Sequence, residues 1–190
     1  MRIIAGEFRG RPLKTLKGSL TRPTTDRVRE ALMSSLYSAR GSFEGACVLD
    51  AFAGSGALGL ECLSRGADFC LFCEQDSQAQ RIIEQNCTSL NLARNRYRVR
   101  KGDTFLLPQN TSQTFDLLFF DPPYAYEANK IASLIQELDE AGCIADNALI
   151  CYEYAKNDAS SVIQAFDALK YVQVSVKHYG DTSLITLRKE

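Results

Sequence analysis

The sequence predicts an α/β protein built around a doubly wound, mostly parallel sheet of seven strands. Short apolar runs alternate along the 190 residues with stretches whose apolar residues recur at helical spacing. A glycine-rich turn directly follows the first of these runs, as it does in sheets that bind ligands at their edge. The last two runs leave no room for a helix between them, so they should form a hairpin that makes one strand antiparallel.

The first 40 residues are predicted to form a basic N-terminal extension, made of an irregular hairpin and a helix. Glycines at positions 6, 10 and 18 interrupt short apolar pairs up to about residue 20, which favours the hairpin. Apolar residues at 28, 31, 32 and 36 share one helical face, and Thr24, Thr25 and Asp26 are typical helix-start residues. We therefore expect a helix over 25–38, followed by a linker over 41–45.

Residues 41–190 are predicted to form the main domain. The apolar runs predict strands at 46–50, 69–74, 97–101, 115–120, 148–153, 170–178 and 182–188. Helical periodicity predicts helices at 56–65, 77–90, 126–140 and 159–167.

Composition indicates a cytoplasmic protein without a structural metal. No apolar run reaches the roughly 18 residues that span a bilayer, and the N-terminus lacks the apolar segment of a secretory signal. The seven cysteines are odd in number and scattered through apolar segments, as expected for reduced thiols. Cys70 and Cys73 lie within a predicted strand, and the chain has one histidine, so we expect no metal site. No apolar stripe suggests dimerisation, so we expect a monomer.

Charge is distributed unevenly along the chain. Residues 1–29 hold eight basic and two acidic residues, a net charge of +6, whereas the remaining residues carry a net charge of −7. A basic arm on an acidic body favours a polyanionic partner. A second basic cluster runs from Arg94 to Lys101, and its period of two would place Arg96, Arg98 and Arg100 on one face of a strand. That cluster fits RNA contact and a charged, solvated edge strand equally well.

The segment from Val48 to Gly59 has the pattern of a strand, a glycine-rich turn and the start of a helix. Gly54, Gly56 and Gly59 match the G-x-G-x-x-G spacing of dinucleotide sites. Asp50 argues against NAD, because a carboxylate at the strand end would repel a pyrophosphate. It would suit a cationic ligand such as S-adenosylmethionine, which carries an α-ammonium group and no phosphate.

Acidic residues also end the next predicted strands. Glu74 follows the second strand, at a position where a carboxylate can bind both ribose hydroxyls, and Asp103 follows the third, where it could accept from an adenine amine. With Asp50 and Asp121, they would line the crevice at the carboxyl edge of the sheet. Each of these acids also fits a cap at the start of a loop.

Residues Asp121-Pro122-Pro123-Tyr124 directly follow the apolar run that ends at Phe120. The two prolines remove two N–H donors, so this loop offers carbonyl oxygens and a carboxylate as hydrogen-bond acceptors. Such acceptors can orient the exocyclic amine of a nucleobase, and Tyr124 could stack on the base. The alternative is an ordinary turn after a strand, with Asp121 as its cap.

The chain resembles the bacterial RsmD family of class I S-adenosylmethionine-dependent methyltransferases. The resemblance rests on the segments 2–6, 9–11, 22–32, 50–59, 121–124 and 179–182, and it covers most of the chain. It implies a Rossmann-like class I methyltransferase domain that methylates N2 of a guanine in 16S ribosomal RNA, either free or in a small subunit or its assembly intermediate.

The resemblance also implies roles for individual residues. Around the cofactor S-adenosylmethionine it implies Asp50, Gly54, Gly56, Glu74 and Asp103, with Thr24 and Arg27 near its methionine end. Around the target base it implies Asp121, Pro122 and Tyr124, and on RNA phosphates Arg2, Arg9, Arg11, Lys14 and Arg22. Thr24 and Arg27 fit a helix cap and a solvated helix face equally well.

Two other functions use the same motifs. A DNA adenine-N6 methyltransferase would normally need a base-reading domain, for which about 40 residues outside the core leave little room. A non-catalytic RNA-binding assembly factor would keep the fold and the basic arm, but it has no physical need for the acceptors of Asp121-Pro122-Pro123-Tyr124.

Overall fold

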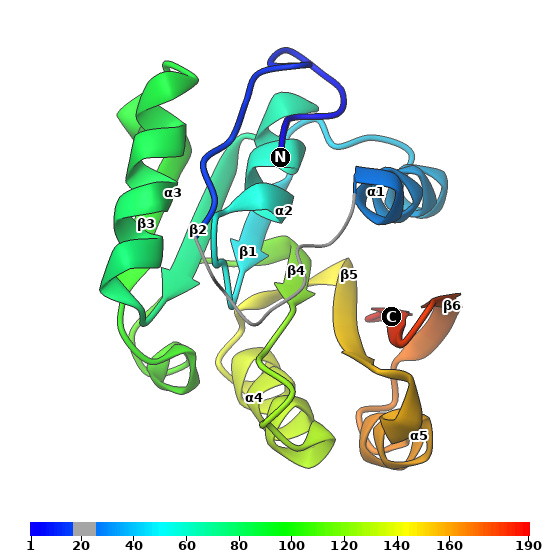
Figure 1. The fold of residues 1–190 in the computed structure, drawn as a ribbon. Helices are drawn as coiled ribbons and strands as arrows, with labels where there is room; N and C mark the ends of the chain where they lie inside the picture. The colour runs from blue at the N-terminus through cyan, green and yellow to red at the C-terminus, as the bar shows by residue number, and fades with distance from the viewer. Residues whose placement is uncertain (17–25) are drawn as a thin grey trace. The chain divides into compact units, whose positions relative to one another are not determined.

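The computed structural model describes residues 1–16 and 26–190. Contacts divide the chain into two compact units, Met1–Thr104 and Phe105–Glu190. Figure 1 follows the chain from blue to red. The predicted domain boundary near residue 40 is not tested by this division and stays a prediction.

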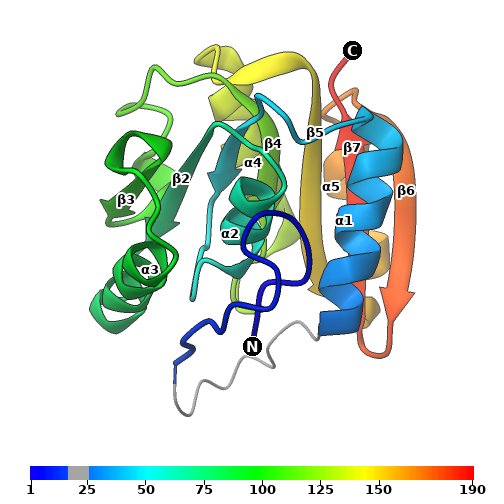
Figure 2. The ribbon, with the colours of Figure 1, turned by 90° about the horizontal axis from the view of Figure 1, so that it is seen from above.

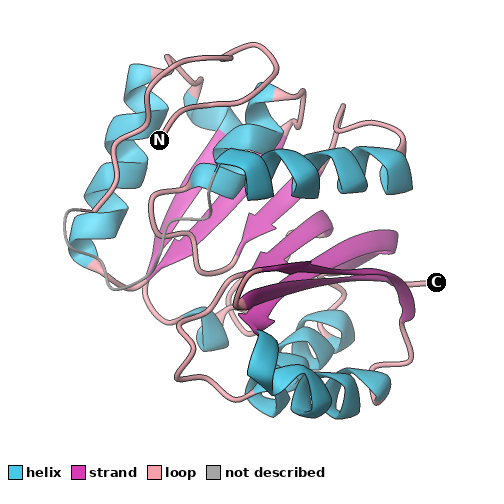
Figure 3. Cartoon of the chain, turned by 45° about the vertical axis from the view of Figure 1, so that its right-hand side comes forward, coloured by secondary structure: helices cyan, strands magenta, loops and turns pink. Residues whose placement is uncertain are grey.

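The first unit contains three parallel strands in the order β3-β2-β1. Its elements are α1 (Asp26–Arg40), β1 (Cys47–Asp50), α2 (Ala57–Ser64), β2 (Phe69–Glu74), α3 (Ser77–Ser89), the 3-10 turn η1 (Arg94–Arg96) and β3 (Tyr97–Lys101). Helices connect the successive parallel strands, as the cyan and magenta elements of Figure 3 show. The central residues of β1 and β2 are buried, which explains their uninterrupted apolar sequences.

Helix α3 begins where its sequence favours a start. The side chain of Asp76 accepts hydrogen bonds from the backbone N–H groups of Gln78 and Ala79, at 3.0 and 2.8 Å. The buried residues Ala79, Ile83 and Cys87 then recur at intervals of four along one face. Capping and periodicity therefore agree on this element.

The second unit contains four strands in the order β4-β5-β7-β6. Its elements are β4 (Phe115–Phe120), α4 (Ala128–Glu140), β5 (Ile144–Ala155), the 3-10 turn η3 (Lys156–Asp158), α5 (Ala159–Asp167), β6 (Val172–Tyr179) and β7 (Thr182–Arg188), while the 3-10 turn η2 (Thr104–Leu106) spans the division. Strands β4 and β5 are parallel, and β7 is antiparallel to both β5 and β6. Figure 2 shows the β6–β7 hairpin, which turns at Gly180 with φ +63°.

An irregular hairpin precedes α1. One isolated bridge pairs Arg2 with Pro12, and Ile3 N–H donates to the Arg11 carbonyl at 3.0 Å. The hairpin packs against the end of α2, where Glu7 N–H donates to the Ser64 carbonyl at 2.7 Å. Gly6 allows this approach, because a Cβ there would lie 1.8 Å from the same carbonyl oxygen.

The structure confirms the predicted fold class, with helices flanking seven described strands of which most are parallel. The helix predicted over 25–38 is α1, although Thr25 lies outside the described residues. The strand predicted over 148–153 is longer at both ends, because β5 starts earlier through an irregular register beside β4 and continues to Ala155 beside β7.

The period-two interpretation of the second basic cluster was wrong for Arg96. This residue lies in η1, before β3 begins at Tyr97. Its guanidinium donates to the carbonyls of Leu63 and Ala67, at 3.0 and 2.7 Å, near the end of α2. Backbone carbonyls near the end of a helix attract a cation, and a long side chain can reach them from a neighbouring segment, so sequence periodicity could not distinguish this position from a solvated strand face.

Candidate active site

The glycine-rich turn between β1 and α2 requires glycine at two positions for different reasons. Gly56 is the N-cap of α2 and has φ +79°, a left-handed conformation that other residues adopt at a cost. At Gly59 there is no room for a side chain, because a Cβ would lie 2.4 Å from the Phe72 ring and 2.5 Å from the Cys70 sulfur. The turn is therefore tight at its centre and closely packed on β2.

Asp50 lies at the end of β1 with 2% of its surface exposed. Its Oδ2 accepts a hydrogen bond from the Gly59 N–H at 3.0 Å, in the first turn of α2. A carboxylate here stabilises the helix start through both the hydrogen bond and the helix dipole. Asp50 therefore caps the start of α2, and its contact with the ammonium group of a cofactor stays a prediction.

Glu74 ends β2 and supports the same turn. Its Oε2 accepts from the Gly54 N–H at 2.8 Å, and its Oε1 accepts from the Asp76 N–H at 2.8 Å. An ionised carboxylate has about four lone-pair sites, so each oxygen retains acceptor capacity for a ligand hydroxyl. A Cβ at Gly54 would meet no atom within 4 Å, which leaves open space beside the turn.

Asp103 follows β3 and is exposed. The preceding Gly102 has φ +135°, and its N–H donates to the Glu74 carbonyl at 3.1 Å. Because β1, β2 and β3 are adjacent and parallel, Asp50, Glu74 and Asp103 lie at the same edge of this part of the sheet. The first unit therefore brings together the three acids that the sequence assigned to the cofactor.

The structure describes only one of three further residues that were predicted to contact the cofactor or RNA. Arg27 is exposed in the first turn of α1. Thr24 and Arg22 lie outside the described residues.

In the second unit, Asp121-Pro122-Pro123-Tyr124 follows β4 directly. The turn closes through Tyr126 N–H, which donates to the Pro123 carbonyl at 3.1 Å. Pro122 is buried, whereas 60% of Tyr124 is exposed, so its ring is available to stack on a planar ligand.

The ring of Tyr124 is held at its far end. Its hydroxyl forms a hydrogen bond with Thr182 Oγ1, and the two oxygens are 3.1 Å apart. Thr182 begins β7, directly after the β6–β7 turn. Sequence reasoning noted the segment from Tyr179 to Thr182 but gave Thr182 no role, and no local pattern connects it with Tyr124, 58 residues away.

Burial raises the pKa of Asp121 from 3.8 to about 6. The carboxyl is still mainly ionised at neutral pH, and it is poorly solvated. A poorly solvated carboxylate is a strong hydrogen-bond acceptor, which suits a group that must bind an amine N–H.

The arm of residues 1–16 carries the basic residues predicted to bind RNA. Arg9 is exposed, and Arg2 forms an ion pair with Asp26 at 3.4 Å. Arg11 donates to the Ser89 carbonyl and Lys14 Nζ donates to Gln85 Oε1 at 3.0 Å, and both contacts attach the arm to α3. All four residues remain exposed, and their contact with RNA stays a prediction.

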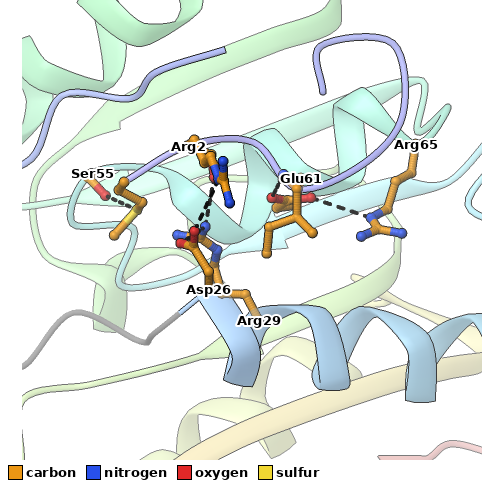
Figure 4. A network of polar contacts seen from close by, with 8 residues as sticks. Arg2, Asp26, Arg29, Ser55, Glu61 and Arg65 are labelled. Atoms are coloured by element: carbon orange, nitrogen blue, oxygen red, sulfur yellow. Dashed lines mark hydrogen bonds and ion pairs between the residues drawn. The ribbon is translucent and has the colours of Figure 1, made fainter. Parts of the chain in front are cut away.

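Arg29 and Glu61 form a buried polar network beneath the arm, which the sequence did not reveal (Figure 4). Neither side chain is exposed to solvent. Arg29 donates to the Arg2 carbonyl at 2.7 Å and to Asp26 at 2.9 Å. Glu61 accepts from Ile4 N–H at 2.6 Å and pairs with Arg65 at 3.4 Å.

The network is poorly solvated. Burial lowers the pKa of Arg29, which the charges of Glu61 and Asp26 partly offset. Burial also raises the pKa of Glu61, against the hydrogen bond from Ile4 and the charge of Arg65. Arg29 is one of the eight basic residues of 1–29, and nothing in the sequence separates it from the others, because basic residues are rarely buried without partners.

The described ranges contain no helix that is both long and apolar enough to cross a membrane. Within the same ranges, no group of three or more His, Cys, Asp or Glu side chains is placed to hold a metal ion.

The strand order, the glycine turn and the acids at the strand ends define the fold of a class I methyltransferase. The chain belongs to the family described as Conserved hypothetical protein 95, which it matches over residues 1–188. This confirms the resemblance to the RsmD family.

Named relatives share most of the chain. The protein "Ribosomal RNA small subunit methyltransferase D" of Escherichia coli K12 is 38% identical over 80% of this chain and 74% of its own length. The protein of the same name from Haemophilus influenzae is 34% identical over 94% of this chain and 91% of its own. The solved structure of the yhhF protein of Escherichia coli is similar with a TM-score of 0.83 and 31% identity, covering 100% of this chain and 98% of the other.

Proposed function

We propose that this protein transfers a methyl group from S-adenosylmethionine to the exocyclic N2 amine of a guanine in 16S ribosomal RNA. The observation that carries this proposal is the acceptor loop Asp121-Pro122-Pro123-Tyr124, with its desolvated carboxylate and exposed aromatic ring. The names of the relatives support ribosomal RNA of the small subunit as the substrate. The choice of guanine N2 comes from the resemblance and from the chemistry of the loop.

The first unit would hold the cofactor. Glu74 would accept from the ribose hydroxyls, since its oxygens keep lone pairs beyond those used by Gly54 and Asp76. Asp103 would accept from the adenine amine, and Asp50 would attract the ammonium group. Open space beside Gly54 suits a ligand that approaches the turn closely. S-adenosylmethionine supplies an activated methyl group on a sulfonium.

The second unit would orient the target base. The Asp121 carboxylate and the Pro122 carbonyl would accept hydrogen bonds from the two N2 hydrogens, which turns the nitrogen lone pair toward the methyl carbon. Tyr124 would stack on the guanine ring. The transfer would be one in-line displacement, in which the guanine nitrogen would bond to the methyl carbon as the sulfonium leaves as a neutral thioether, and the amine would lose a proton to solvent or to the Asp121 carboxylate. Most of the rate would come from positioning and desolvation.

The basic arm would bind phosphates of the RNA, in a free transcript, a small subunit or an assembly intermediate. A base that is paired in the substrate must be flipped out, which costs a few kcal/mol. We propose that the reaction takes place in the cytoplasm, on a monomeric enzyme.

The test is methylation with tritiated S-adenosylmethionine. Purified protein is incubated with 16S ribosomal RNA or small subunits from a strain lacking the enzyme, and with unmethylated DNA, and the labelled nucleoside is identified. We expect label in N2-methylguanosine. Label in N6-methyladenine of DNA would contradict the substrate, and tight cofactor binding without any label would favour an assembly factor.

A variant tests the assigned role of the acceptor loop. Asp121→Ala should lower kcat by roughly 100-fold or more, the usual cost of removing one positioned polar group, while the Kd of S-adenosylhomocysteine changes by less than about threefold. A parallel loss of cofactor binding in a calorimetric titration would refute the role of Asp121 in holding the base.

A further inference from the structure

Asn86 of α3 joins two segments that the proposed function assigns to different ligands. Its side chain is buried, with 1% exposed. Its Nδ2 donates to the Lys14 carbonyl at 3.1 Å and to the Ser55 carbonyl at 3.0 Å, while its Oδ1 accepts from Lys14 N–H at 2.8 Å. Lys14 belongs to the basic arm, and Ser55 lies between Gly54 and Gly56 of the cofactor turn.

One amide group cannot serve these two segments independently. An asparagine side chain has two N–H donors on one nitrogen, and both carbonyls bind that nitrogen. Because the amide is planar, a rotation that releases one carbonyl also misaligns the other. Departure of the arm would leave a buried amide with unsatisfied groups, which costs about 1–3 kcal/mol unless Asn86 turns away from Ser55.

Other contacts concentrate the arm on the same helix. Gln85 and Ser89 of α3 bind the side chains of Lys14 and Arg11. At its start, the arm meets the cofactor turn again, since the Met1 sulfur lies 3.9 Å from the Ser55 hydroxyl (Figure 4). The opposite side of the turn is fixed by Glu74, which accepts from Gly54 N–H. The position of the Ser55 carbonyl therefore depends on Asn86 and the arm from one side and on Glu74 from the other.

We propose that Asn86 is a positioning residue that couples RNA binding at the arm to cofactor binding at the turn. The proposal rests on the proposed function, because it requires that the arm binds RNA. RNA that holds the arm against α3 fixes Asn86, which in turn fixes the Ser55 carbonyl in the conformation that receives S-adenosylmethionine. Coupling of binding free energies is reciprocal, so the cofactor strengthens RNA binding by the same factor.

The experiment measures the Kd of S-adenosylhomocysteine by calorimetry, with and without a saturating 16S ribosomal RNA transcript. In the unaltered protein we expect RNA to tighten cofactor binding by about fivefold, at the lower end of typical couplings. Asn86→Asp keeps the acceptor for Lys14 N–H and removes both donors, and Asn86→Ala removes all three bonds. Both variants should reduce the coupling below about twofold.

Gln85→Ala is the matched control, because it removes an arm contact from the same helix without touching Ser55. It should weaken RNA binding slightly and retain the coupling. A second readout follows amide hydrogen exchange in the unaltered protein, where RNA should slow exchange at residues 54–56 as well as in the arm. This readout needs no variant, so it tests the coupling between RNA binding and the turn even if the Asn86 variants fail to fold.

The outcomes separate the two proposals. If no ribosomal RNA binds or is methylated, the proposed function fails. If RNA binds and is methylated but cofactor affinity and exchange at residues 54–56 do not change, the proposed function stands and the coupling is refuted. Coupling that survives in a folded Asn86→Ala variant also refutes the role of Asn86.

Discussion

Single carboxylates at the strand ends of this protein hold the protein's own backbone. Asp50 accepts from Gly59 N–H, and Glu74 accepts from Gly54 N–H. The sequence left open whether each acid was a loop cap or a ligand group. The structure shows that Asp50 and Glu74 both bind backbone N–H groups of the turn and helix start. Glu74 also keeps lone pairs with which it could bind a ligand.

At the scale of one methyl group, Gly59→Ala should destabilise the protein. The new Cβ would overlap the Phe72 ring and the Cys70 sulfur, and overpacking of this kind costs about 1–3 kcal/mol. Urea unfolding measures the change. Adding Phe72→Leu should recover part of the loss, so the two changes should be clearly non-additive. Full additivity would show that the helix shifts away freely.

Because of Asp121, stability and activity should change in opposite directions as pH rises. Burial raises its pKa to about 6 in the folded protein, above the 3.8 of an exposed carboxyl. The folded state then binds more protons than the unfolded state between these values, so the free energy of unfolding falls as pH rises from about 4 to about 6 and stays lower above. The methyl transfer needs the ionised form, so kcat/KM should rise with pH toward a plateau above about 6.

Asp121→Asn removes the buried charge. Above pH 7 it should raise the free energy of unfolding by about 1–2 kcal/mol, after discounting the shift for partial exposure, and it should lower the rate of methyl transfer, because an amide oxygen is a weaker acceptor than a carboxylate. Thermal unfolding at pH 5 and pH 8 measures this, with roughly half of the pH 8 gain expected at pH 5, which lies between the unfolded and folded pKa values. A gain of equal size at both pH values would contradict the pKa shift as its cause.

At the scale of elements, α1 and α2 hold the arm through the Arg29–Glu61 network. Arg29→Ala should cost about 1–3 kcal/mol, because it removes one of the two cations that offset the burial of Glu61 and takes the donor away from the Arg2 carbonyl. The arm should also become more accessible, so trypsin should cleave after Arg9 and Lys14 at lower concentration. Arg27→Ala is the matched control on an exposed position of the same helix, and its effect should stay within about 0.5 kcal/mol.

The strands show where element-level prediction works. The mainly apolar runs 69–74 and 115–120 matched β2 and β4 residue for residue, since a strand buried on both faces needs a mostly apolar sequence. The same logic failed for Arg96, because this residue lies in η1 before β3 begins, and its guanidinium reaches back to the end of α2. Long flexible side chains are poor markers of the face on which their Cα lies.

For the whole molecule, the uneven charge predicts salt-dependent RNA binding. Arg9 is exposed on the arm, so Arg9→Ala should weaken binding to 16S ribosomal RNA and reduce the slope of log K against log salt by about 0.7–0.9. Filter binding between low and moderate salt measures this slope. An unchanged slope would show that Arg9 makes no phosphate contact.

The second basic cluster can be tested in the same assay. Arg98 is exposed on β3, whereas Arg94 pairs with Glu84 at 3.2 Å and Arg96 binds backbone carbonyls. A reduced slope for Arg98→Ala would assign this cluster to RNA. An unchanged slope would leave it as the charged edge of the sheet.

The sequence by itself determined the fold class, the glycine-rich turn, the acceptor residues of Asp121-Pro122-Pro123-Tyr124 and the family. Patterns of a few neighbouring residues predict these features, as the spacing of Gly54, Gly56 and Gly59 does for the turn. Tertiary structure alone decided which polar groups are buried and what satisfies them. Arg29 meets Arg2 across 27 residues, Tyr124 meets Thr182 across 58, and Asn86 meets Lys14 across 72. No local pattern records such pairs, because the need to satisfy a buried polar group sets no rule for where along the chain its partner lies.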